Sequence, residues 1–205
     1  MNIAIIGSGN IGSTLARGLS KSGHQIYLGT RHPEDEKIKN LIRENNNIEA
    51  LSVSEAAQRA EVIIIAAPPD ATKDIVHHMG DVKGKILIDT MNSVRTKAGD
   101  FVSSAEALRV WTGNNDVVKC FNTTGFNIMA NPDFSGIKAD MFMAGSSKKG
   151  KEIARQLALD MGFDECYDFG GDDKIPLLEQ FAFIWINLAI NQNLGRDIAF
   201  KLLKK

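Results

Sequence analysis

One short glycine-rich segment constrains the fold of this 205-residue chain more than any other feature. It reads Gly7-Ser8-Gly9-Asn10-Ile11-Gly12 and directly follows the apolar run 3–6. The pattern G-x-G-x-x-G is weak alone, but between a strand and a helix it is typical of dinucleotide-binding folds. The first glycine permits a tight turn, the second lets the backbone approach a pyrophosphate, and the third lets the helix pack closely on the strand. The segment therefore predicts a phosphate-binding turn.

The rest of the chain alternates between short apolar runs and segments with helical spacing. We expect strands over 3–6, 25–30, 62–66, 85–89, 117–121 and 140–144, with an edge strand over 163–169. We expect helices over 11–19, from Pro33, after the capping pair Ser52 and Glu55, over 70–79, over 154–161 and over most of 174–203, with a break at Gly195. This alternation predicts an α/β chain of Rossmann type, with a doubly wound, mostly parallel sheet and a C-terminal helical segment.

Composition and length favour one domain that spans residues 1–205. The chain has 24 Lys and Arg against 25 Asp and Glu, so it lacks the basic excess of nucleic-acid-binding proteins. Its two cysteines, Cys120 and Cys166, are too few for a disulfide framework or a four-cysteine zinc site. The beginning of the chain does not resemble a signal peptide. We therefore expect a cytoplasmic protein with no nucleic-acid partner and no metal.

The apolar stretch 181–190 tests this interpretation. It reaches only about half of the roughly 20 residues that a membrane-spanning helix needs. Glu179, Gln180, Asn191 and Gln192 lie at its two ends. A buried helix or a subunit interface is the better interpretation, and no membrane contact is expected.

The end of the second predicted strand indicates which dinucleotide binds. NAD-type sites place an acidic residue there to hold the ribose 2′-hydroxyl. This chain instead reads Gly29-Thr30-Arg31-His32. A guanidinium and a hydroxyl suit a 2′-phosphate, because Arg binds phosphate with two parallel hydrogen bonds. We predict that Thr30 and Arg31 select NADP, although Arg31 facing solvent without a ligand is the alternative.

The ends of the later strands complete the predicted crevice, because ligands of such sheets lie beyond the carboxyl ends of the strands. The small residues Ala66, Ala67 and Pro68 would let a flat ring approach the backbone there. Asn92 and Asn122 could bind a carboxamide or a ribose, or could be simple turn residues. We place all five in the cofactor-binding set.

The sequence offers no residue that we assign to acid–base catalysis. The adjacent His77 and His78 point to different sides of a helix, and His24 follows a glycine stop. The two tyrosines lack the Tyr-x-x-x-Lys spacing of short-chain dehydrogenases, and Cys120 lies in a buried strand. Hydride exchange between two redox cofactors needs less, namely two stacked rings shielded from water. Apolar candidates for that pocket, each also compatible with ordinary core packing, are Met91, Phe121, Phe126, Ile128 and Met129.

Taken in order, the segments IIGSGNIG, YLGTRHP, AAP, DTMN and VVKCFNT resemble the NADP oxidoreductases that use coenzyme F420, a deazaflavin. The same segments are similar to the cytosolic reductase domain of the STEAP metalloreductases. The segment VVKCFNT resembles the metalloreductases more closely than the F420-dependent enzymes. The resemblance implies a Rossmann-type fold, NADP bound by residues 7–12, 30–31 and 66–68, and hydride transfer to a flavin or deazaflavin. It further implies a homodimer that pairs through the C-terminal helices.

Three hypotheses follow for the activity. The first is an NADPH-dependent oxidoreductase whose acceptor is a small-molecule flavin or deazaflavin, with coenzyme F420, FMN and FAD as candidates. The second is a reductase of a small imine or keto substrate, similar to pyrroline-5-carboxylate or β-hydroxyacid enzymes. The third is a non-catalytic NADP-sensing module that presents its C-terminal helix to a partner.

Overall fold

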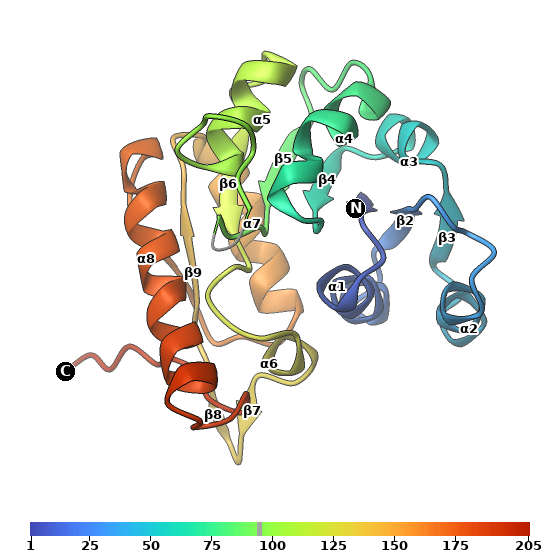
Figure 1. The fold of residues 1–205 in the computed structure, drawn as a ribbon. Coiled ribbons are helices and arrows are strands. Elements are labelled where there is room, and N and C mark those ends of the chain that lie inside the picture. Colours follow the sequence, from blue (N-terminus) through green and yellow to red (C-terminus); the bar gives the residue numbers. More distant parts are fainter. Residues whose placement is uncertain (94–95) are drawn as a thin grey trace.

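The computed structural model describes residues 1–93 and 96–205 as an eight-stranded sheet with helices on both faces (Figure 1). The strand order is β10-β9-β6-β5-β4-β1-β2-β3. Strands β1 to β6 run parallel, β9 is antiparallel to β6, and β10 is parallel to β9. The strands are β1 (Asn2–Ile6), β2 (Gln25–Gly29), β3 (Ile48–Leu51), β4 (Val62–Ile65), β5 (Ile86–Asp89), β6 (Val117–Cys120), β9 (Met141–Ala144) and β10 (Cys166–Asp168). The predicted doubly wound, mostly parallel sheet is confirmed.

Two layers of helices bury the two faces of this sheet. Helices α1 (Asn10–Lys21), α2 (Glu36–Glu44), α6 (Phe126–Ala130) and α7 (Lys148–Asp160) pack against one face. Helices α3 (Val53–Arg59), α4 (Thr72–Met79), α5 (Ser104–Thr112) and α8 (Ile175–Ile186) pack against the other. A small hairpin, β7 (Asp133–Phe134) with β8 (Ile137–Lys138), extends beyond the sheet. The central strands β4, β5 and β6 are buried throughout, which is why their sequences are nearly continuous apolar runs.

Local signals set most of the element boundaries. The capping box of α3 is present, since the Ser52 side chain accepts from the Glu55 backbone N–H and Glu55 binds back to Ser52. Two details differ from the sequence prediction. Helix α2 begins at Glu36 with Asp35 as its N-cap, three residues later than a start at Pro33. Strand β3 was not predicted, because an edge strand with one buried residue lacks a strong apolar pattern.

The C-terminal segment corrects the prediction of a helix over most of 174–203. Helix α8 is continued by one π-helical turn, Asn187–Asn191, and residues 192–205 contain neither helix nor strand. The indole N–H of Trp185 donates to the Ile198 carbonyl at 2.7 Å, so this tail folds back on α8. Apolar composition alone suggested a helix, whereas contacts with distant segments hold the tail in an irregular course.

Asp140, the residue directly before β9, anchors the returning tail. The backbone N–H of Asp140 donates to the Phe200 carbonyl, and the Asp140 carboxylate accepts from the Leu202 N–H and from Lys201 Nζ. The Phe200 ring packs on Phe181 of α8 with centroids 4.5 Å apart. The last residues of the chain are thus part of the folded domain.

Three further features bear on the sequence predictions. Cys120 and Cys166 are both buried with their Sγ atoms 3.8 Å apart, but β9 lies between their strands, and this spacing argues against a disulfide. Burial raises the pKa of the Cys120 thiol. No helix in the described ranges is long and apolar enough to cross a membrane. Likewise, those ranges hold no group of three or more His, Cys, Asp or Glu side chains suited to a metal ion.

Candidate dinucleotide and hydride-transfer site

The glycine turn lies where the sheet reverses its strand order, between β1 and its two neighbours β2 and β4. Gly7 has a φ of 114°, and a Cβ there would lie 2.3 Å from the Ala66 carbonyl oxygen. A Cβ on Gly12 would lie 1.9 Å from the carbonyl oxygen of Gly7. Both glycines are therefore required by the fold itself, because any side chain would overlap the backbone.

Gly9 differs from these two glycines. It is exposed, and a Cβ built there would meet no atom within 4 Å. It is the N-cap of α1, a helix with no side-chain cap and no acidic residue in its first turn. The first N–H groups of a helix lack partners within the helix, so those of α1 face an open space beside Gly9. A helix N-terminus left open in this way is an anion site of the kind that binds a pyrophosphate.

The second predicted element lies next to the glycine turn. Ser8 Oγ and Thr30 Oγ1 are 3.1 Å apart, and Thr30 Oγ1 also accepts from the His32 backbone N–H at 3.2 Å. These bonds fix the backbone that leads into Arg31, whose side chain is exposed. Arg31, His32 and Lys37 all lie at the surface of this end, which gives a basic rim beside the phosphate-binding turn. The arrangement fits a dinucleotide with a 2′-phosphate.

A pocket of about 340 Å³ opens on the other side of the glycine turn. Four segments form its wall, namely the start of α1 and the loops that follow β4, β5 and β6. Its lining residues are Gly9, Asn10, Ile11, Ala66, Ala67, Pro69, Thr90, Met91, Asn92, Phe121, Asn122 and Thr124. Seven predicted site residues are thus brought together here, and we refer to this cavity as the strand-end pocket. Pro68 is exposed at its edge and does not line it.

Two hydrogen-bonded asparagines lie side by side in the wall of the strand-end pocket. Asn92 Nδ2 donates to the backbone carbonyl oxygen of Asn122 at 2.7 Å, and Asn122 Nδ2 donates to the side-chain oxygen Oδ1 of Asn92 at 3.0 Å. Asn122 Oδ1 and the hydroxyls of Ser93 and Thr124 are buried and make no hydrogen bond among the described residues. Buried polar atoms without partners are uncommon, so a cluster of them beside a pocket indicates that a polar ligand completes the site.

The apolar candidates divide between the pocket and the core. Met91 and Phe121 line the strand-end pocket, as predicted. Phe121 also has a φ of 61°, a strained conformation for a bulky residue that often marks a functional site. The other three candidates, Phe126, Ile128 and Met129, lie on α6 and do not line the pocket. Ile128 and Met129 instead belong to the core cluster that contains α1, because α6 packs across that helix.

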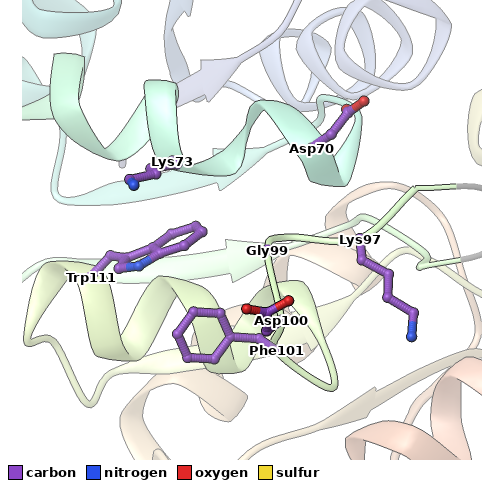
Figure 2. Close-up of a pocket in the computed structure, with 7 residues that line it drawn as sticks. All are labelled: Asp70, Lys73, Lys97, Gly99, Asp100, Phe101 and Trp111. Atoms are coloured by element: carbon purple, nitrogen blue, oxygen red, sulfur yellow. The ribbon is translucent and has the colours of Figure 1, made fainter.

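A larger cavity of about 610 Å³ lies between α4, α5 and the loop before α5 (Figure 2). Trp111 and Phe101 form its aromatic side, with ring centroids 5.1 Å apart. Two acidic and two basic side chains complete its lining, namely Asp70, Asp100, Lys73 and Lys97. None of the predicted site residues lines this cavity, and its balanced charges favour no particular ligand. The smaller strand-end pocket is therefore the better candidate site.

Sequence reasoning missed one group of residues behind this pocket. Lys119 on β6 is fully buried. Its Nζ lies 2.8 Å from Asp89 Oδ2 and 2.7 Å from Oε1 of Glu179, a residue of α8. Two signals were present in the sequence, a lysine inside an apolar strand and a single carboxylate inside an apolar helix. Their proximity could not be predicted, because the three residues are far apart in the chain.

The open N-terminus of α1, the basic rim and the unpaired oxygens beside the strand-end pocket all fit a dinucleotide. Fold and site together define a Rossmann-type dinucleotide-binding protein. Residues 2–93 match the family model of the coenzyme F420-dependent NADP oxidoreductases, which confirms the resemblance predicted from the motifs. This family and the curated relatives below are NAD(P)-dependent oxidoreductases.

The curated relatives include glycerol-3-phosphate dehydrogenases [NAD(P)+]. That of Pelodictyon phaeoclathratiforme is 24% identical over 214 residues, which cover 80% of this chain and 62% of the relative. The chain therefore spans less than two thirds of the length of such relatives.

Solved structures agree on the fold. A proposed F420-dependent NADP reductase from an Arthrobacter species superposes with a TM-score of 0.87 and 23% identity over the full length of both chains. A hypothetical protein from Sinorhizobium meliloti has a TM-score of 0.72 and 26% identity, and covers 100% of this chain and 96% of its own. A reductive aminase from Aspergillus terreus, solved with NADPH, has a TM-score of 0.72 and 14% identity over 94% of this chain and 62% of its own.

Proposed function

We propose that this protein is an NADP(H)-dependent oxidoreductase that transfers hydride between NADPH and a flavin or deazaflavin acceptor. In this proposal the first turn of α1 and Gly9 bind the pyrophosphate. Thr30 and Arg31 hold the 2′-phosphate, and the strand-end pocket receives the nicotinamide. Asn92 and Asn122 orient the carboxamide, for which the unpaired Asn122 Oδ1 is a ready acceptor.

When bound, NADPH supplies a hydride from its nicotinamide ring to the acceptor; the ring is oxidised to a cation and the reduced acceptor takes a proton from water. The protein residues have two tasks in such a reaction. They bring two planar rings into contact, and they exclude water from the contact. Met91, Phe121 and the small residues Ala66 and Ala67 suit both tasks, because they offer a flat, apolar wall.

One observation carries the choice of a redox acceptor. None of the described residues that line the strand-end pocket has an ionisable side chain. Reduction of a keto or imine substrate profits from a positioned proton donor, whereas hydride transfer to a flavin-type ring needs mainly proximity and orientation. The lining of the pocket therefore supports a redox cofactor as acceptor.

The experiment is a titration of the purified protein with NADPH and NADH, followed by oxidation assays with FMN, FAD, a deazaflavin and ferric chelates. Selective NADPH binding with turnover of a flavin or deazaflavin is the expected result. Turnover of a keto or imine compound alone would favour a reductase of a small substrate. Among the solved structures with a similar fold are a reductive aminase and an imine reductase. Tight NADPH binding without any turnover would favour a sensing module.

We also propose a homodimer that forms through α8. Three large aliphatic side chains on this helix and its π-helical turn, Leu177, Ile184 and Ile190, are between 41% and 55% exposed, and exposed apolar surface of this kind can mark a protein interface. A monomeric mass in sedimentation at micromolar concentration would contradict this proposal. The cytoplasmic location stays a prediction from the sequence.

A further inference from the structure

A group of three buried charged side chains contacts the backbone of Met91, which lines the strand-end pocket. Asp89 ends β5, Lys119 lies beside it on β6, and Glu179 reaches them from α8. Their exposed fractions are 0%, 0% and 6%. We refer to these three residues as the buried charge cluster.

The cluster holds the backbone of one pocket residue from both sides. Asp89 Oδ1 accepts from the Met91 backbone N–H at 2.8 Å, and Lys119 Nζ donates to the Met91 carbonyl at 2.7 Å. Ser104, at the start of α5, donates to Asp89 Oδ2 at 2.6 Å and accepts from Lys119 at 3.2 Å. The position of Met91 in the pocket wall therefore depends on the cluster.

Glu179 is not needed to pair Lys119, since Asp89 already does so at 2.8 Å. It is the only charged residue of α8, whose sequence is otherwise nearly all apolar. A buried carboxylate costs more desolvation than a well-packed apolar residue at the same position. Stability alone thus gives no reason for a second carboxylate here. The cluster thus sets two carboxylate groups against one ammonium group, so its acidic groups outnumber its basic group by one.

We propose that the buried charge cluster positions Met91 and, through its excess negative charge, favours the oxidised nicotinamide over the reduced one in the strand-end pocket. The inference rests on the proposed function, in which that pocket receives the nicotinamide. The reduced ring is neutral, and loss of the hydride leaves a positive charge on it. A negative charge buried close behind the wall attracts this cation with little screening by water. In this scheme Asp89 and Lys119 position Met91, whereas Glu179 acts through its charge and favours hydride donation by NADPH.

Glu179→Gln tests the inference, since it removes the excess charge but keeps the shape of the side chain and an oxygen for Lys119. The dissociation constants of NADP+ and NADPH are measured for the wild-type protein and the variant. We expect the ratio Kd(NADP+)/Kd(NADPH) to rise by about threefold to tenfold in the variant. Glu179→Met is a second variant of similar size with the same expected direction. Glu152→Gln, an exposed site on α7 at the opposite face of the sheet, is the control and is expected to leave the ratio unchanged.

The ratio separates an electrostatic role from a structural one. A variant that weakens both nucleotides equally, or leaves the ratio at the wild-type value, overturns the inference while the proposed function stands. A wild-type protein that binds neither nucleotide overturns the proposed function, and the inference with it. Circular dichroism shows which of the two Glu179 variants fold. A rise in the ratio for every variant that folds supports the inference.

Discussion

The glycine-turn region, made of β1, α1 and β2, and the C-terminal edge, made of β9, β10, α8 and the tail, are held together by opposite means. In the first region, neighbouring segments leave no room for a side chain at certain glycines. A Cβ on Gly12 would lie 1.9 Å from the Gly7 carbonyl oxygen, and one on Gly29 would lie 2.6 Å from the Ile6 side chain. In the second region, large side chains pack against one another. The ring centroid of Phe181 lies 4.8 Å from that of Phe142 and 4.5 Å from that of Phe200.

This difference teaches where each region tolerates change. The glycine-turn region depends on the absence of side chains at a few fixed positions. The C-terminal edge depends on the presence of particular large or charged side chains from distant segments. A methyl group added at one of these crowded positions should therefore destabilise the first region, and truncation of a large side chain should destabilise the second.

The largest effect is expected for Gly12→Ala. The added Cβ would overlap the carbonyl oxygen of Gly7, because the first turn of α1, which contains Gly12, packs directly on the turn that follows β1. We expect a loss of about 3 kcal/mol in the free energy of unfolding, or failure to fold. Urea denaturation measures it, and a stability close to wild type would show that the turn can open.

Phe200→Ala tests the opposite region. The ring packs on Phe181, so its removal should lower the free energy of unfolding by about 2–3 kcal/mol. Leu203→Ala, at a site 85% exposed, is the matched control and should change stability by less than about 0.5 kcal/mol. Equal effects in urea denaturation would show that the tail is not anchored by its aromatic contact.

Arg31→Ala probes the ligand side of the glycine-turn region. Loss of a charge-assisted contact to the 2′-phosphate should weaken NADPH binding by about 1.5–3 kcal/mol, which is tenfold or more, and leave NADH binding unchanged. Fluorescence titration with both nucleotides measures this. Arg43→Ala on α2 serves as the control. An equal loss for both nucleotides would contradict a role in selecting NADP.

Gly9→Ala sharpens the comparison within the glycine turn. Its Cβ meets nothing in the protein, so stability should stay within about 0.5 kcal/mol of wild type. The same methyl group would stand in the space proposed for the pyrophosphate, and we expect about a tenfold loss in NADPH affinity. The two readouts are a melting curve and a nucleotide titration. Unchanged affinity would place the pyrophosphate elsewhere.

The smallest effect is expected at the C-terminal edge from Glu165→Gln. Arg155 donates two hydrogen bonds of 2.7 Å to Glu165 and so lowers the pKa of that carboxyl below 4.5. A lowered folded-state pKa stabilises the protein above the unfolded value, and this contribution is lost as the pH falls through the folded value. The variant should be less stable than wild type by under about 1 kcal/mol at neutral pH, with the difference vanishing in acid. Urea denaturation at several pH values measures it, and a difference that persists in acid would point to packing.

The sequence predicted the glycine turn, the parallel sheet and most of the strand-end pocket. It could do so because each depends on local rules: glycines at fixed spacing, apolar strands, and loops that must meet at one edge of a parallel sheet. The alternation of strands and helices carried the fold class in the same way. The assignment of Asn92 and Asn122 to one site followed from their places after the carboxyl ends of two predicted strands, and in the structure Asn122 Nδ2 lies 3.0 Å from Asn92 Oδ1.

Only the tertiary structure decided the course of residues 192–205 and the meeting of Lys119, Asp89 and Glu179. Its apolar residues suggested a helix, but the contacts of the tail with Asp140 and Phe181 hold it in an irregular course. The three charged residues come from two strands and a helix far apart in the chain. Local sequence patterns record the period of a strand or helix. They do not record which distant side chain neutralises a buried charge, because that depends on how the elements pack.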